Sequence, residues 1–201
     1  MAIKWPVAYP GAHWLDAREE RAVLDVLHRR SLFRYYGMKP PKSVARLEQT
    51  ARSLYDAKFA LGVSSGTGAL FTAMTALGIG PGCEVIVPAF LWVATVGAVV
   101  NANAIPVLCE VDDSLCMDWQ DLERKITPRT RLIVAVHMAG APCDMQRVMA
   151  VANRHLFPCW RTARRPMAVP SAAASWARSG CSACSACNGT RTPPRAKAVF
   201  W

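Results

Sequence analysis

Short apolar runs alternate with segments of helical periodicity between residues 59 and 153, and this alternation constrains the fold more than any other feature. The run at 132–136 is nearly continuous, which is typical of a strand buried on both faces of a parallel sheet. We therefore predict an α/β fold with a mostly parallel sheet flanked by helices. The expected strands are 59–63, 84–87, 105–111 and 132–136, and the expected helices are 16–30, 44–55, 67–77, 93–101 and 144–153.

The charge of the chain is unevenly distributed. There are 24 Lys or Arg and 14 Asp or Glu, but the last acidic residue is Asp144, and seven of the basic residues fall within 156–201. Residues 1–155 are therefore only mildly basic, and net charge alone does not indicate a nucleic-acid-binding protein. Residues 1–10 do not resemble a signal peptide and no apolar run is long enough to span a bilayer. We expect a cytoplasmic protein that binds neither nucleic acid nor membranes.

The segment Val63-Ser-Ser-Gly-Thr-Gly-Ala-Leu70 leads from an expected strand directly into an expected helix. Glycines let an anion approach the backbone closely, and hydroxyl groups and the N–H groups of a helix start can hold it. The segment matches neither the Walker motif nor the G-x-G-x-x-G dinucleotide fingerprint. It is a candidate phosphate site, although a simple tight turn would give the same pattern.

Two further motifs follow along the chain. They are LGIGPGCEVIVP at 77–88, with Trp92 before Val-Ala-Thr, and VHMAGAPCDM at 136–145. With the serine–glycine segment, they resemble the DegT/StrS-type aminotransferases of sugars and cyclitols, which depend on pyridoxal 5′-phosphate (PLP), over residues 14–155. Cys83 stands where that family usually has Asp. The resemblance implies that 1–155 form the N-terminal part of the large domain of a type I aminotransferase.

The resemblance also implies roles for individual residues. Ser65, Gly66, Thr67 and Gly68 would hold the PLP phosphate, and Trp92 would stack on the pyridine ring. Without the motif, Trp92 would be interpreted as a core aromatic residue. The implied reaction is transfer of an amino group from glutamine or glutamate to a keto-sugar or keto-cyclitol, by a homodimer in intact relatives.

His137 ends an expected strand, where α/β proteins commonly bind ligands. Two interpretations of His137 are open: it binds the substrate, or it orients the loop that follows. We expect Asp144 to serve only as the N-cap of the next helix.

Two groups that transamination requires are missing from the motifs of this sequence. In the family, one of these groups is a Schiff-base lysine and the other is an acid that binds the pyridinium nitrogen. Both come from a part of the sequence that follows the position at which this chain stops resembling the family. Residues 156–201 contain no acid and one lysine, Lys197, whose context matches no family motif. We therefore assign no catalytic residue, and we expect an inactive chain in which PLP binding is weak or lost.

A one-base shift of the reading frame after His155 accounts for the tail. In that frame, back-translation of Trp160–Ser171 can give Leu-Glu-Asp-Cys-Ala-Gln, which contains the E-D-x-A-Q motif of the family. The same shift of 181–201 can place a lysine before Gly-Glu-Gly-Gly. We interpret 156–201 as an out-of-frame, disordered basic tail.

Two alternatives to this interpretation concern binding. Cys181, Cys184 and Cys187, with Cys159 upstream, have the C-x2-C spacing of structural zinc sites, so the tail could be a metal-binding module. We favour the interpretation that these cysteines result from out-of-frame translation, and we predict no metal site. The other alternative is a non-catalytic α/β module that binds a different phosphate ligand.

Overall fold

The computed structural model describes residues 15–30, 32, 42–55, 57–138, 141–163, 183–187 and 198–200. The chain divides into two compact units, 1–46 and 47–201, and each is described by itself. The elements in chain order are α1 (Ala17–His28), α2 (Lys42–Tyr55), β1 (Phe59–Leu61), α3 (Gly66–Ala76), β2 (Glu84–Pro88), α4 (Val93–Asn101), β3 (Ile105–Cys109), α5 (Trp119–Lys125), β4 (Thr130–His137), α6 (Met145–Arg154), β5 (Cys159–Ala163), β6 (Ala183–Cys187) and β7 (Ala198–Phe200).

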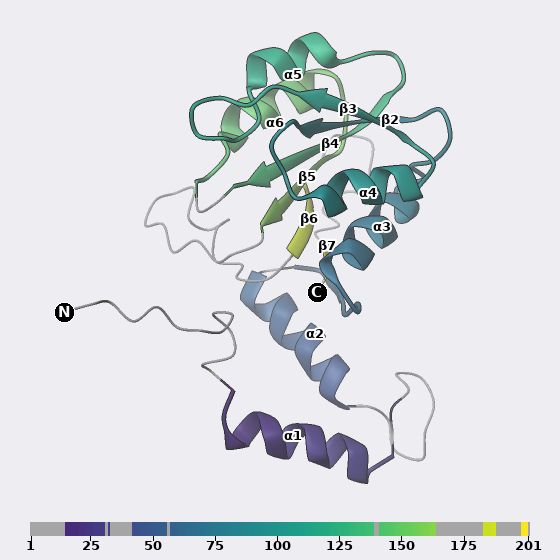
Figure 1. The fold of residues 1–201 in the computed structure, drawn as a ribbon, viewed down its shortest axis with the longest axis vertical. Coiled ribbons are helices and arrows are strands. Elements are labelled where there is room, and N and C mark those ends of the chain that lie inside the picture. The colour runs from purple at the N-terminus through teal and green to yellow at the C-terminus, as the bar shows by residue number, and fades with distance from the viewer. Residues whose placement is uncertain are drawn as a thin grey trace, which may run out of the picture. The chain divides into compact units, whose positions relative to one another are not determined.

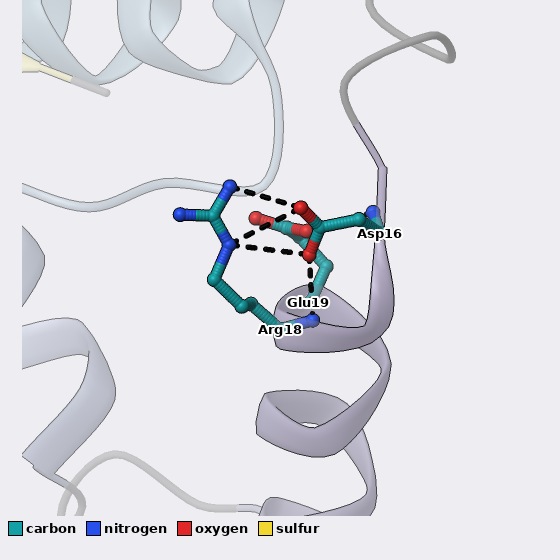
Figure 2. Close-up of polar contacts among 3 residues, drawn as sticks. All are labelled: Asp16, Arg18 and Glu19. Carbon is teal, nitrogen blue, oxygen red and sulfur yellow. Dashed lines mark hydrogen bonds and ion pairs between the residues drawn. The ribbon is translucent and has the colours of Figure 1, made fainter.

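In the first unit, α1 begins at a reciprocal cap. The Asp16 carboxylate accepts the Arg18 N–H at 2.7 Å, and the Asp16 N–H donates to the Glu19 carboxylate at 2.9 Å. Figure 2 shows the Arg18 guanidinium facing the same Asp16 carboxylate, which it contacts at 2.9 Å. The hydrogen bonds from the Arg18 side chain and backbone lower the pKa of Asp16. The predicted helix start at Asp16 is confirmed.

The second unit is built on a seven-stranded sheet with the strand order β1-β7-β6-β5-β4-β2-β3. Figure 1 labels the strands from β7 to β3 of this order. β6 runs antiparallel to both of its neighbours, β5 and β7, and the other paired strands are parallel. All strands of this sheet other than β6 therefore run in the same direction. Their carboxyl ends lie at one edge of the sheet, called the carboxyl edge below, and their amino ends lie at the other, the amino edge.

Successive side chains of β2 and β4 point to opposite faces of the sheet and supply two cores. One set packs with α3 and α4: Val85, Val87, Leu132 and Val134. The other set packs with α5 and α6: Ile86, Ile133 and Ala135. Helices thus cover both faces, α3 and α4 on one and α5 and α6 on the other (Figure 1). Burial on both faces explains why the centres of these strands, 85–88 and 132–136, are apolar.

The α/β fold and its largely parallel sheet, predicted from the sequence, are confirmed. The apolar pattern does not predict α5, because this helix has seven residues and the only apolar one it fully buries is Leu122. No helix in the part of the chain that the structure describes is long and apolar enough to cross a membrane.

Three segments of the tail join the sheet. β5, β6 and β7 all fall within 156–201, and β5 pairs with β4 from Cys159↔Ile133 to Ala163↔His137. The backbone groups of these three segments pair along the edge that β4 would otherwise leave open, and the disorder expected of the tail stays a prediction. The rest of the tail lies outside the described residues.

A buried carboxylate fixes the amino end of β2. Glu84 accepts hydrogen bonds from the Thr127 hydroxyl and, at 2.8 Å, from Arg129 Nε. The bond from Thr127, followed by the Arg129 guanidinium, lowers the pKa of Glu84, while burial opposes this shift. The N–H of Glu84 also donates to the Arg129 carbonyl at 2.9 Å. The turn before β4 is thereby fastened to β2.

A second buried carboxylate, Asp121, ties α5 to the sheet. Its Oδ2 accepts the N–H of Glu110, directly after β3, at 2.8 Å, and its Oδ1 accepts from the Arg124 guanidinium at 3.2 Å. The backbone hydrogen bond from Glu110 is the largest cause that lowers the pKa of Asp121.

We predict that Asp121→Asn lowers the free energy of unfolding by about 1–3 kcal/mol near neutral pH, because a buried donor loses its charged acceptor. The folded-state pKa of Asp121 is lowered, so its contribution is complete above the ordinary aspartate pKa. That contribution is lost as the pH falls through the folded-state value. Urea unfolding at a series of pH values should show the difference between wild type and variant closing on acidification.

The matched control for this variant is Asp113→Asn, which changes an exposed aspartate in the connection that precedes α5. Its unfolding free energy should stay close to that of the wild type at every pH. A deficit of Asp121→Asn that stays constant down to the acid transition would contradict the role given to the Asp121 charge.

Candidate functional site

The predicted site residues lie at the carboxyl edge of the sheet. Ser65 follows β1, Trp92 follows β2, and His137 ends β4. Because these three strands run in the same direction, the segments after them reach the same edge, where open α/β sheets bind ligands. The contiguous residues 65–68 come together directly, while Trp92 and His137 share the edge with them from separate strands.

The start of α3, residues 64–68, is the predicted phosphate site and is called the phosphate cradle below. Ser65 is the N-cap, and its Oγ accepts the N–H of Gly68 at 3.0 Å. The first helical backbone bond runs from the Ala69 N–H to the Ser65 carbonyl at 2.9 Å. The N–H groups of Gly66 and Thr67 precede that bond, so they have no carbonyl partner within the helix. They are available to an anion placed at the helix start.

The cradle is tight at Gly68. A Cβ atom there would lie 3.3 Å from the Ser65 hydroxyl oxygen and 3.9 Å from that of Ser64. The first of these distances is tighter than ordinary van der Waals contact, so a methyl group would push against the capping serine. Glycine at 68 therefore lets two serine hydroxyls gather over the first turn of the helix.

The electrostatics of the cradle favour an anion. The first turn of α3 holds no acidic residue, so the positive end of the helix dipole is not neutralised from within the helix. The hydroxyl-bearing residues Ser64, Ser65 and Thr67 are exposed to solvent. The strand end before them is held by Glu48 of α2, whose carboxylate accepts the Gly62 N–H at 2.7 Å. This arrangement is suited to a phosphate group, which combines negative charge with several acceptor oxygens.

Trp92 is a surface residue. It occupies the N-cap position of α4, and 60% of its surface area is exposed. Its neighbours Phe90 and Val93 are exposed as well, at 48% and 74%. The interpretation of Trp92 as a core aromatic residue is therefore wrong. An accessible aromatic face at this edge is what stacking on a planar ligand ring requires.

His137 makes a defined contact with the loop that follows β4. Its Nδ1 accepts the backbone N–H of Cys143 at 3.0 Å. Because a backbone N–H donates to it, Nδ1 is unprotonated, and the neutral ring carries its proton on Nε2. The loop-orienting interpretation of His137 is thus observed directly, and its substrate-binding role stays a prediction.

Asp144 is the N-cap of α6, as predicted. Its carboxylate accepts the Arg147 N–H at 3.1 Å and forms an ion pair with the Arg147 guanidinium at 3.2 Å. The guanidinium also lies 5.2 Å from the centre of the Trp119 ring of α5, in cation–π contact. The contacts of Asp144 are thus explained by its role as the cap at the start of α6.

Of the four buried cysteines in the core beneath α5 and α6, which include Cys109, three lie close enough to interact: Cys116, Cys143 and Cys159. The Cys116 thiol donates to the Ala141 carbonyl at 3.6 Å, which brings the β3–α5 connection against the β4–α6 connection. Sequence reasoning misses this group, because its members come from three segments with no characteristic spacing. Folding brings them together only through the pairing of β4 with β5 and the packing of two connections.

The metal-binding alternative concerned the tail cysteines. Of Cys184 and Cys187 only the backbone is described, as part of β6, and Cys181 lies outside the described residues. Among the residues that the structure does describe, no group of three or more His, Cys, Asp or Glu is arranged to hold a metal ion.

Comparison with known proteins gives close matches over most of the chain. The L-glutamine:2-deoxy-scyllo-inosose aminotransferase of Micromonospora echinospora is 39% identical over 157 residues, which are 77% of this chain and 36% of that protein. The solved structure of DesV from S. venezuelae, in complex with a ketimine intermediate, is 36% identical with a TM-score of 0.60, covering 71% of this chain and 38% of that one.

A sugar aminotransferase from Streptococcus pneumoniae, solved in its PMP form, is 31% identical with a TM-score of 0.63. The match covers 71% of this chain and 34% of that one. This chain therefore spans little more than a third of the length of these relatives. The family model described as the DegT/DnrJ/EryC1/StrS aminotransferase family matches residues 15–164. The chain belongs to this family of aminotransferases.

Proposed function

We propose that the phosphate cradle and Trp92 bind pyridoxal 5′-phosphate or its amino form, pyridoxamine 5′-phosphate (PMP). The observation that carries the proposal is the start of α3, with its serine cap, two helix N–H groups outside the intrahelical bonds and a glycine where a methyl group would crowd the cap. The Streptococcus pneumoniae relative was solved in both PMP and PLP forms, which supports a cofactor of this class.

The reaction that fits the relatives is transfer of an amino group from glutamine or glutamate to a keto-sugar or keto-cyclitol. The name of the Micromonospora echinospora relative includes both a glutamine donor and a cyclic ketone acceptor. When bound, the cofactor supplies an electron sink and a carrier for the amino group. The residues of this chain would hold the phosphate at Ser65–Gly68, cover one ring face with Trp92 and position the loop after His137.

The cradle can be tested by direct binding of PMP, which needs no covalent bond to lysine. We predict that Ser65→Ala raises the Kd for PMP about tenfold, because a hydrogen bond to a charged phosphate is lost together with the helix cap. Gly68→Ala should weaken binding at least as much, since its methyl group pushes against the Ser65 hydroxyl. Titration calorimetry with the full chain measures both changes.

The matched control is Thr75→Ala at the other end of α3, where the hydroxyl donates only to the Phe71 carbonyl within the helix. This variant should keep the wild-type Kd, and circular dichroism should show all three variants folded. Equal affinity of Ser65→Ala and Thr75→Ala would contradict the cradle. Tight binding of a nucleotide by a chain that does not bind PMP would favour the alternative of a different phosphate-binding module.

The chain is proposed to lack the catalytic lysine. Two lysine side chains are described, Lys58, directly before β1, and Lys125, at the end of α5 before β4. Both positions adjoin the amino ends of strands, whereas the cradle lies at the carboxyl edge. Neither described side chain therefore meets the covalent requirement of transamination.

We predict no transamination by this chain with glutamine as donor and 2-deoxy-scyllo-inosose as acceptor. Borohydride reduction after incubation with PLP should leave no cofactor attached near the cradle, as peptide mass mapping will show. The full-length Micromonospora echinospora relative, assayed in parallel, is the positive control. Turnover by this chain, or a reduced lysine adduct that depends on Ser65, would overturn the prediction.

The tail is proposed to be read out of frame. The family model matches up to residue 164 and leaves 165–201 unmatched, which supports a change of character in the tail, although the match ends nine residues beyond the predicted shift after His155. We predict that independently prepared DNA will contain codons over 156–201 whose shifted frame encodes the E-D-x-A-Q motif and a later lysine. Resequencing decides this, and codons that cannot encode that motif in the shifted frame would end the proposal.

A further inference from the structure

We propose that Glu48 of α2 is a positioning residue for the phosphate cradle. Its carboxylate holds the backbone at Gly62 and thereby fixes the path of the chain into the Ser65 cap. The inference rests on the proposed function, in which the cradle binds a cofactor that carries a phosphate group. Glu48, β1 and the cradle all belong to the second unit of the chain.

The backbone that leads into the cradle lies beyond the pairing of β1. This strand pairs with β7 from Phe59 to Leu61, and Gly62 is the first residue after that pairing. Only Val63 and Ser64 separate Gly62 from the Ser65 cap. A hydrogen bond at Gly62 therefore controls the position from which the chain enters the cap.

Glu48 supplies this hydrogen bond from a neighbouring helix. Its Oε1 accepts the Gly62 N–H at 2.7 Å. A carboxylate that accepts a backbone N–H forms a charge-assisted bond, which is stronger than a neutral one. The Glu48 side chain is half-buried, and Ala51, one turn further on the same face of α2, is 2% exposed. This face of α2 is therefore packed, which limits the positions that the carboxylate can take.

The cradle depends on where Ser65 is placed. Its backbone is extended, with φ −163° and ψ 160°, while its Oγ accepts the Gly68 N–H at 3.0 Å. The N–H groups of Gly66 and Thr67, proposed to bind phosphate, follow directly. Residues 62–65 lie between β1 and α3, in no helix or strand of their own. A displacement at Gly62 is therefore passed on to the cap and to the direction of these N–H groups.

The charge of Glu48 makes the direction of the effect informative. If Coulomb repulsion were the main influence of this carboxylate on a bound phosphate, its removal would tighten binding. Positioning predicts the opposite for Glu48→Ala, which loses the acceptor. It also predicts that Glu48→Gln, which keeps an acceptor oxygen without the charge, behaves like the wild type.

The test uses the full chain labelled with ¹⁵N-glycine, so that amide hydrogen exchange is measured at single glycines. In Glu48→Ala we expect exchange to be about tenfold faster at Gly62 and about threefold faster at Gly68, whose N–H is bonded to the serine cap. Gly78 is bonded at the other end of α3, and its exchange should stay unchanged. The Kd for PMP, measured by titration calorimetry, should rise about tenfold.

The controls separate positioning from general destabilisation. Glu48→Gln should restore the exchange rates and the Kd, and Gln49→Ala, at an exposed neighbour on α2, should match the wild type. Unchanged exchange at Gly68, equal acceleration at Gly78, or tighter PMP binding by Glu48→Ala would overturn the proposal. If Glu48→Ala does not fold, Glu48→Asp, which draws the carboxylate back from Gly62, is measured in its place.

The two kinds of measurement keep this inference distinct from the proposed function. A wild type that does not bind PMP would end the proposed function. The exchange rate of Gly68 is measured without ligand, and it still decides whether Glu48 positions the cradle.

Discussion

The burial of β2 and β4 on both of their faces is the constraint on which the rest of the second unit depends. Each fully buried aliphatic side chain contributes about 1.5–3 kcal/mol, and these two strands contribute to both cores at once. The helices on either face pack against the same two strands. The two edges of the sheet carry different groups. The amino edge carries the buried carboxylate of Glu84, and the carboxyl edge carries the serine and glycine turn of the cradle.

Features encoded by consecutive residues could be predicted from the sequence. The helix at 93–101, the caps at Asp16 and Asp144 and the apolar strand at 132–136 each depend on a local pattern, and the structure contains all of them. Features that depend on distant partners could not. α5 is fixed by the bond between Asp121 and the Glu110 backbone, and β6 and β7 are fixed by pairing with strands far along the chain.

The candidate site likewise has features that could be predicted from consecutive residues and features that could not. The cradle could be predicted because its hydroxyls, glycines and helix start are contiguous. The two interpretations of His137 are separated only by the contact of its Nδ1 with the backbone of Cys143. The interpretation of Trp92 as a core residue is excluded only by its exposure in the folded chain. The buried cysteines had no sequence signal, since spacing does not show the contact between the two connections that brings them together.

The order of the central strands has a consequence for synthesis on the ribosome. β2 lies between β3 and β4, and β4 comes more than forty residues after β2 along the chain. Until β4 has left the exit tunnel, Val85 and Ile86 lack the neighbouring strand with which both cores are completed. Nascent chains that stop short of residue 137 therefore present an apolar strand with one open edge, the form most prone to pair with another chain. Translation speed during the interval in which β3 has emerged from the tunnel and β4 has not would set how long this exposure lasts.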